Sequence, residues 1–240
     1  MRIDVMGVPF ENVTMTEAVD AAVRILDTGR TAYCVTPNSE IVYEAIFNAE
    51  LREVLCGADL VLPDGAGVVL GAKILGTPLK QKVAGIEFIE NLMQQLENTD
   101  RSFFLLGSKP GVADQAAEKL LKKYPELTIA GTADGYFQDD AEAIAKVNAV
   151  KPDVLMVCLG APKQEFFMWN HKNELDVGLM VGLGGSLDGF AGNVKRAPRW
   201  MIRCNLEWLY RLIKEPRRIG RMMRLPKFII LVVRRRITGK

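Results

Sequence analysis

In the second half of the chain, short apolar runs alternate with longer segments whose apolar residues recur at helical spacing. The apolar runs predict strands at 102–106, 127–130, 153–159 and 177–183, and the longer segments predict helices at 112–124, 140–150 and 163–175. Strands that are apolar on both faces and alternate with helices are typical of a parallel sheet covered on both sides. We therefore predict an α/β fold with a Rossmann-like, mostly parallel sheet and helices on both faces.

The first half follows the same pattern after a short strand or hairpin arm at residues 2–10. Thr14-Met15-Thr16-Glu17 forms a capping-box pattern that opens an amphipathic helix through Leu26. The further elements predicted are a strand at 32–35, a helix to about residue 55, a strand at 58–62, a helix at 68–75 and a helix at 86–96. The loops that follow parallel strands share one edge of a sheet, so we expect them to line one crevice.

Length and composition describe a globular protein. A chain of 240 residues, 49% hydrophobic and 25% charged, suits one large domain, alone or with an appendage. Its four cysteines are scattered without a C-x-x-C pair, which favours reduced thiols in a cytosolic protein over disulfides or a metal site. The first residues lack the pattern of a signal peptide, and no apolar run approaches the roughly 20 residues that cross a bilayer.

Charge is distributed unevenly. Residues 196–240 hold 14 Lys and Arg against two acids, a net charge of +12, whereas residues 1–195 hold 17 against 27, a net charge of −10. This contrast predicts an acidic body over 1–195, where we expect any catalytic site to lie, and a basic appendage over 196–240 whose partner is an anionic surface.

Asp64 is the principal candidate for catalysis. It follows the apolar run at 58–62 within Pro63-Asp64-Gly65-Ala66-Gly67, where proline stiffens the chain and the glycines permit a tight turn. A carboxylate held in a turn at the ligand edge suits a general base. The alternative is that Asp64 only caps the helix that follows, and the stretch alone supports both interpretations about equally.

Thr36-Pro37-Asn38 leaves a neighbouring predicted strand toward the same edge. Thr36 is at least as well explained as a helix cap, with Pro37 at the first helical position. Asn38 is less needed for capping, so we predict that its amide binds a polar ligand such as a sugar hydroxyl.

Two glycine turns are further candidates. Gly107-Ser108-Lys109-Pro110-Gly111 is neither a Walker loop nor a G-x-G-x-x-G motif, and although a phosphate could bind the helix start there, an ordinary turn is the better explanation. In Gly160-Ala161-Pro162-Lys163-Gln164-Glu165, proline fixes a helix start, Glu165 suits the helix dipole and Gln164 suits a ligand contact. Gly107, Gly160, Gly185 and Tyr136 all lie in turns after strands, and we count them with Thr36, Asn38 and Gln164 as substrate-binding residues.

Metal and cofactor chemistry have little support. His171 stands alone in mid-helix, which favours a surface or half-buried residue over a ligand. The chain has no D-x-D pair, the usual means of holding a divalent ion against a nucleotide diphosphate, and no dinucleotide or serine-hydrolase pattern. We predict no metal and no cofactor. Lys82, in a loop, is a cation that could offset charge on a leaving phosphate.

The basic appendage has aliphatic and aromatic residues at roughly helical spacing, with arginines between them. Pro216 and Pro226 are predicted to break it, and the apolar run at 228–233 is followed by Arg234-Arg235-Arg236. We favour an interfacial element with its apolar face in lipid. The alternatives are a helix packed on the body or on a second copy of the chain in a homo-oligomer. A nucleic-acid arm would not need so many aliphatic residues.

Together these motifs resemble the WecG/TagA/CpsF family of bacterial glycosyltransferases. The matching stretches run in the family's order along nearly the whole chain and are 36–38, 63–65, 134–137, 160–165, 196–200, 206–212 and 215–218. No single stretch is decisive, but jointly they are highly specific.

The resemblance implies an inverting enzyme that works without an evident metal. It implies transfer of N-acetylmannosamine from UDP-ManNAc to the 4-hydroxyl of GlcNAc on undecaprenyl diphosphate, which commits the lipid to wall teichoic acid linkage-unit synthesis. By this resemblance Asp64 is the base, Thr36, Asn38 and Gln164 line the pocket, and Arg211, Arg218 and Arg221 close it over the lipid diphosphate at the inner face of the cell membrane. Many members carry arginine where this chain has Lys82, and lysine lacks the bidentate fork.

Two other functions fit the sequence. The same fold could use another UDP-sugar such as UDP-ManNAcA, whose extra carboxylate would call for another cation in the pocket. The protein could also be a non-catalytic module that binds a nucleotide-sugar or a membrane.

Overall fold

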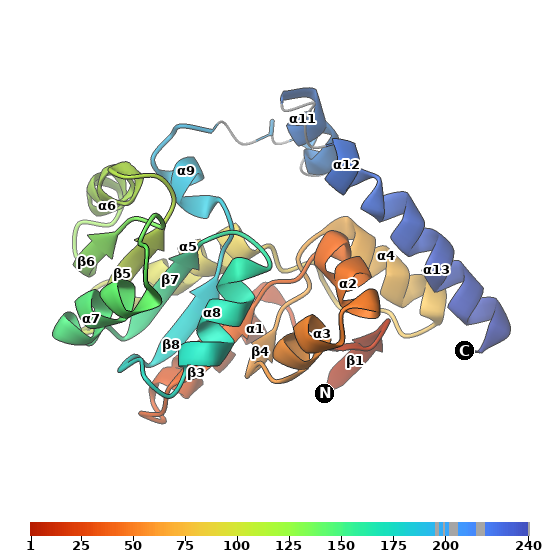
Figure 1. Cartoon of the computed structure of the whole chain (residues 1–240), viewed down its shortest axis with the longest axis horizontal. Coiled ribbons are helices and arrows are strands. Elements are labelled where there is room, and N and C mark those ends of the chain that lie inside the picture. Colours follow the sequence, from red (N-terminus) through yellow and green to blue (C-terminus); the bar gives the residue numbers. More distant parts are fainter. Residues whose placement is uncertain (195–196, 199, 202–205, 215–218, 240) are drawn as a thin grey trace.

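The computed structural model of the chain describes residues 1–194, 197–198, 200–201, 206–214 and 219–239, and at residues 207, 211, 221 and 222 it describes the backbone alone. Within these residues, six parallel strands form one sheet in the order β4-β3-β8-β7-β5-β6, and β1 and β2 form a separate antiparallel hairpin (Figure 1). The predicted α/β, Rossmann-like fold is confirmed.

The strands of the sheet are short, and all except the edge strand β6 are almost entirely buried. Strand bounds are β1 Arg2–Val5, β2 Val8–Glu11, β3 Ala32–Val35, β4 Leu60–Val61, β5 Ser102–Gly107, β6 Thr128–Ala133, β7 Val154–Cys158 and β8 Leu179–Gly182. Helix bounds in the body are α1 Met15–Leu26, α2 Ser39–Phe47, α3 Ala49–Cys56, α4 Ala66–Leu75, α5 Gly85–Leu96, α6 Val112–Lys123, α7 Asp140–Val150, α8 Lys163–His171 and α9 Ser186–Phe190. The basic segment contains α11 Glu207–Lys214, α12 Ile219–Met222 and α13 Arg224–Thr238.

Two hydrophobic layers cover the sheet, one on each face. Helices α1, α5, α6 and α9 form the first layer. Helices α2, α3, α4, α7, α8 and α13 form the second together with the β1–β2 hairpin. This two-sided cover explains why the inner strands are mostly apolar along their length rather than alternating.

The predicted elements agree with the structure except at a few ends. The capping box of α1 is present, with Thr14 and Glu17 each bonding the other's backbone. The single helix predicted up to about residue 55 is wrong, because Asn48 ends α2 and its side chain caps α3 through the amide of Leu51. The helix predicted to residue 175 ends at His171.

Helix α13 corrects the account of the basic appendage. Pro226 does not break it, because the proline lies in the first helical turn, where no intrahelical partner is needed for its missing N–H. Phe228 and Val232 are fully buried against the body, next to Gly71 of α4. The prediction that this apolar run faces lipid is therefore wrong for this side of the helix, which packs on α2 and α4 (Figure 1).

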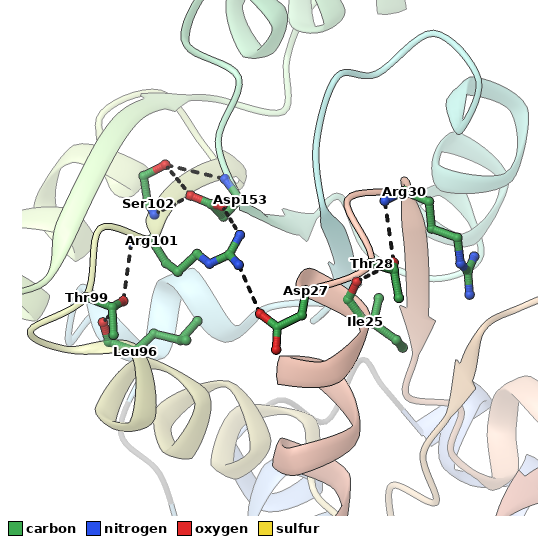
Figure 2. Close-up of polar contacts among 9 residues, drawn as sticks. All are labelled: Ile25, Asp27, Thr28, Arg30, Leu96, Thr99, Arg101, Ser102 and Asp153. Atoms are coloured by element: carbon green, nitrogen blue, oxygen red, sulfur yellow. Dashed lines mark hydrogen bonds and ion pairs between the residues drawn. The ribbon is translucent and has the colours of Figure 1, made fainter.

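The amino ends of β5 and β7 are joined by a polar network that also reaches the end of α1 (Figure 2). Asp153, just before β7, accepts from the Arg101 guanidinium at 2.7 Å and from the backbone N–H of Ser102 at 2.8 Å. Arg101 also donates to Asp27 at the end of α1, at 3.1 Å. Burial raises the pKa of Asp153, but the hydrogen bonds from Arg101 and Ser102 outweigh it and hold the pKa below its usual value.

Candidate functional site

The buried polar side chains of the described residues gather at the opposite edge, where the strands end. They are Thr36 and Ser39 after β3 and Gln164 and Glu165 after β7. Polar side chains are rarely buried without a partner or a function. Their clustering at the carboxyl ends of parallel strands marks this edge as the candidate site.

Asp64 lies at this edge, in the turn between β4 and α4. Its side chain is half-buried, and Oδ2 accepts from the backbone N–H of Gly85, the first residue of α5, at 3.2 Å. The capping alternative is thus wrong for the helix that follows, since α4 begins after Gly65 without a side-chain cap. The amino end of α5 instead stabilises the carboxylate charge.

Thr36 does not cap a helix. Its Oγ1 donates to the carbonyl of Gly182 at the end of β8, at 2.9 Å. A Cβ on Gly85 would lie 2.9 Å from that same Oγ1, so the glycine allows α5 to start directly against Thr36. Thr36 and Asp64 therefore meet the same residue from neighbouring strands.

Asn38 has the capping role that we assigned to Thr36. Its Oδ1 accepts from the backbone N–H groups of Glu40 and Ile41 at 2.9 and 3.2 Å, as the N-cap of α2. The prediction that Asn38 is less needed for capping than Thr36 is wrong, because its Oδ1 makes the cap. Its Cβ would lie 3.5 Å from a Cβ placed on Gly65, so the residue borders the turn of Asp64.

Gln164 is buried, and both ends of its amide bond the protein. Oε1 accepts from the backbone N–H of Gly184 at 2.8 Å, and Nε2 donates to Glu165 Oε1 at 2.9 Å. The first of these bonds ties the first turn of α8 to the loop after β8. The predicted ligand contact through Gln164 is untested, and the structure adds an internal bonding role.

These contacts form one row across four neighbouring strands. In the sheet order β4-β3-β8-β7, the row runs from Asp64 through Gly85 to Thr36, then to Gly182 and Gly184, and then to Gln164. The partners are far apart in the chain, 146 residues for Thr36 and Gly182. Only the parallel register of the sheet brings them together.

The glycine turns after β5 and β7 lead into helices that lie on opposite faces of the sheet. Helix α6, after β5, packs on the first layer, whereas α8, after the adjacent β7, packs on the second. Such a switch point is where α/β sheets bind ligands. At Gly107 (φ +132°) a Cβ would lie 2.3 Å from the Cys158 carbonyl oxygen, so packing alone requires this glycine. At Gly160 and Gly185 a Cβ would meet no described atom within 4 Å.

Two further candidates lie beside turns at this edge, Tyr136 near the turn after β5 and Lys82 near the turn of Asp64. Tyr136 is 66% exposed, and the preceding residue, Gly135, donates to the carbonyl of Ser108 at 2.9 Å. Lys82 is half-buried, and its neighbour Val83 donates to the carbonyl of Pro63 at 2.9 Å, so the loop of Lys82 runs beside the turn of Asp64.

Sequence reasoning missed two features of this edge. Ser108 Oγ donates to Asp188 of α9 at 3.0 Å, which joins the loops after β5 and β8. Glu165, assigned to the helix dipole, is fully buried with Oε2 lacking a hydrogen-bond partner among the described residues. The apolar residues that follow Glu165, Phe166-Phe167-Met168-Trp169, are the one sequence sign that it faces the interior.

The three tail arginines predicted for substrate binding remain untested. Arg211 lies in α11 and Arg221 in α12, with only their backbone described, and Arg218 lies outside the described residues.

The lone histidine is half-buried, as predicted. His171 Nε2 lies 3.0 Å from Asp140 Oδ2. Cys34, Cys56 and Cys158 are free thiols, while Cys204 falls in a part that the structure does not describe. Over the described ranges, no three His, Cys, Asp or Glu side chains form a metal-binding group.

A doubly wound parallel sheet with a polar row at the carboxyl ends of its strands belongs to the class of α/β proteins that bind ligands at that edge. A family model described as "Glycosyl transferase WecG/TagA/CpsF family" matches residues 3–240. The chain belongs to this family, as the motifs indicated.

Relatives with a named activity align over most of the chain. A protein of Bacillus spizizenii is 40% identical over 87% of this chain and 81% of its own length. One of Bacillus subtilis strain 168 is 37% identical, covering 95% and 90%, and one of Staphylococcus aureus strain MW2 is 33% identical, covering 97% and 92%. Each is named N-acetylglucosaminyldiphosphoundecaprenol N-acetyl-beta-D-mannosaminyltransferase.

Proposed function

We propose that this chain transfers N-acetylmannosamine from UDP-ManNAc to the 4-hydroxyl of GlcNAc on undecaprenyl diphosphate, forming a β1,4 linkage. The observation that carries the proposal is the near full-length similarity to three transferases named for this acceptor and this sugar. The position of Asp64 at the ligand edge of the sheet supports it.

In this mechanism Asp64 is the general base. It takes the proton of the acceptor hydroxyl while that oxygen attacks the anomeric carbon from the face opposite UDP. The bond from the anomeric carbon to the diphosphate breaks, and UDP leaves with the electron pair. The hydrogen bond from Gly85 holds one carboxylate oxygen at 3.2 Å and so orients the group.

The cations near the site would offset the charge of the leaving diphosphate. Lys82 is one candidate in the described structure, since its neighbour Val83 hydrogen-bonds to the carbonyl of Pro63 beside Asp64. Arg211, Arg218 and Arg221 would add charge when the appendage meets the membrane.

A product assay tests the proposal directly. The full-length protein is incubated with a short-prenyl GlcNAc diphospholipid and, separately, UDP-ManNAc, UDP-ManNAcA and UDP-GlcNAc, and products are identified by mass spectrometry. We expect a ManNAc-GlcNAc lipid from UDP-ManNAc alone. Product from UDP-ManNAcA would reassign the donor. If no donor gives product, the transferase proposal is wrong and the protein is instead a non-catalytic binding module.

We also propose that the appendage docks on an anionic membrane. Among the described residues no helix is both long enough and apolar enough to cross a bilayer. The outer side of α13 exposes Ile230, Val233 and Ile237 at 65%, 39% and 78% beside three consecutive arginines. Aliphatic side chains next to cations suit an interfacial helix.

Vesicle binding measures this docking. In pelleting assays with anionic vesicles, Ile237→Glu should weaken binding about five- to tenfold, because it replaces an aliphatic side chain that would enter the lipid and lowers the net charge of this surface by one. The matched control is Leu121→Glu, since Leu121 is 40% exposed on α6, on the other layer of the body. Equal binding by both variants would exclude α13 as a docking element.

A further inference from the structure

Glu165 is the most completely buried charged residue of the described structure. Its side chain has 0% exposure at the third position of α8. Oε1 accepts from Gln164 Nε2 at 2.9 Å, and Oε2 has no hydrogen-bond partner among the described residues. The proposed reaction does not use this carboxyl, so its presence needs another reason.

Keeping an acid here is costly. Burial raises the pKa of Glu165 to about 7, the hydrogen bond from Gln164 opposes that rise, and the charge of Glu44 on α2 adds to it. Glu44 is itself paired with Arg224 of α13 at 2.6 Å. An apolar residue of similar volume would avoid the desolvation cost. A buried acid at the edge of a ligand site is a common sign of a functional role.

The bonding of Gln164 shows what this role is. Its amide has two chemically different ends, an acceptor oxygen and a donor NH₂ group. In the observed orientation the oxygen faces the N–H of Gly184 and the NH₂ group faces Glu165. A flipped amide would set donor against donor at Gly184 and acceptor against carboxylate at Glu165. The carboxylate therefore selects the orientation that holds Gly184.

We propose that Glu165 is a positioning residue for the transferase site: by fixing the Gln164 amide, it holds the loop Gly184-Gly185-Ser186 at the carboxyl end of β8. Gly184 follows Gly182, whose carbonyl accepts from Thr36, so the same contact steadies the strand end next to Thr36. Glu165 touches no reacting atom and acts only through Gln164. This inference rests on the proposed function only in assuming that the β8 loop borders the substrate.

A double-mutant cycle tests it with a readout independent of activity. Hydrogen exchange of the Gly184 amide is measured in Gln164→Leu, Glu165→Leu and the double variant. We expect each single variant to speed exchange about tenfold or more, because the partly buried Gly184 N–H loses its acceptor or its acceptor is no longer oriented. The double variant should match Gln164→Leu, since Glu165 has no effect without the amide.

The matched control is Glu142→Leu. Glu142 holds the same third position in α7 but is exposed, so its replacement should leave Gly184 exchange unchanged. The kcat/KM for the nucleotide-sugar should fall about tenfold in the three Gln164 and Glu165 variants and stay unchanged in the control.

Each contrary result is decisive. Unchanged Gly184 exchange in Glu165→Leu, or additive effects in the double variant, would overturn the proposal. Removing a buried acid should not unfold the protein above pH 7, so a Glu165→Leu chain that fails to fold would assign Glu165 a structural role instead. A wild-type protein without transferase activity would overturn the proposed function, while the exchange cycle would still decide the role of Glu165.

Discussion

The two edges of the sheet shift the pKa of an acid in opposite directions. At the amino edge, Asp153 is saturated by Arg101 and Ser102, and these bonds hold its pKa low against burial (Figure 2). At the carboxyl edge, Glu165 is more deeply buried, has one hydrogen bond from an uncharged amide, and has its pKa raised to about 7. The amino edge joins elements firmly, and the carboxyl edge keeps Glu165 in a setting that costs stability.

The comparison separates a structural edge of the sheet from the edge that carries the candidate site. The amino edge links α1, β5 and β7 through charge-assisted bonds that need no ligand. The carboxyl edge carries Asp64, Thr36 and Gln164 in a row whose bonds are mostly to single backbone groups. Sites that bind and react are commonly less stable than the scaffold that supports them.

The largest contrast should be in turnover. Asp64→Asn should lower kcat by about 10²–10⁴, because an amide cannot accept the acceptor's proton. Asp153→Asn should leave kcat within about twofold, since it lies at the other edge. Single-turnover assays on both variants, with unchanged circular dichroism, check this. Near-normal turnover by Asp64→Asn would remove Asp64 as the base.

The next effect concerns stability and pH. The pKa of Glu165 rises from its ordinary 4.5 when unfolded to about 7 when folded, so the folded chain keeps a proton that the unfolded chain has released. Wild-type stability should therefore fall as pH rises through that window.

Glu165→Gln removes this penalty. The variant should match the wild type near pH 4.5 and exceed it by about 3 kcal/mol at pH 8, as judged by urea unfolding at several pH values. The matched control is Glu142→Gln, which removes an exposed carboxyl at the same position of α7. A constant difference for Glu165→Gln would mean that the carboxyl is not desolvated.

The smallest effect should have the opposite sign. Asp153→Asn should cost about 1–2 kcal/mol at neutral pH, because it loses a charge-assisted bond to a partly exposed arginine. The pKa of Asp153 is lowered in the fold, so this contribution is present above the unfolded value near 4 and is lost as pH falls through the folded pKa. Urea unfolding between pH 3 and 7 measures it, and a loss that grows toward low pH would contradict the ion pair.

Local patterns predicted most elements because their causes are local. The capping box at Thr14 and Glu17 was predicted correctly, since both partners lie within one turn. Thr36 and Asn38 were confused because both are capping residues beside a proline, and what separates them is the carbonyl of Gly182 on another strand. The sequence pattern favoured lipid for the side of α13 that carries Phe228 and Val232, whereas in the structure these side chains are buried beside α4, an element distant in the chain.

The α/β class, the sheet edge that carries Asp64 and the family motifs could all be read from the sequence. Each depends on residues that are close together in the chain or on the order of such segments. Which polar groups form hydrogen bonds with one another could be seen only in the tertiary structure. It joined Thr36 to Gly182, Gln164 to Gly184 and Asp64 to Gly85, and it enclosed Glu165 among residues distant in the chain. The physical reason is that burial and hydrogen bonding depend on strand register and helix packing, which short segments do not specify.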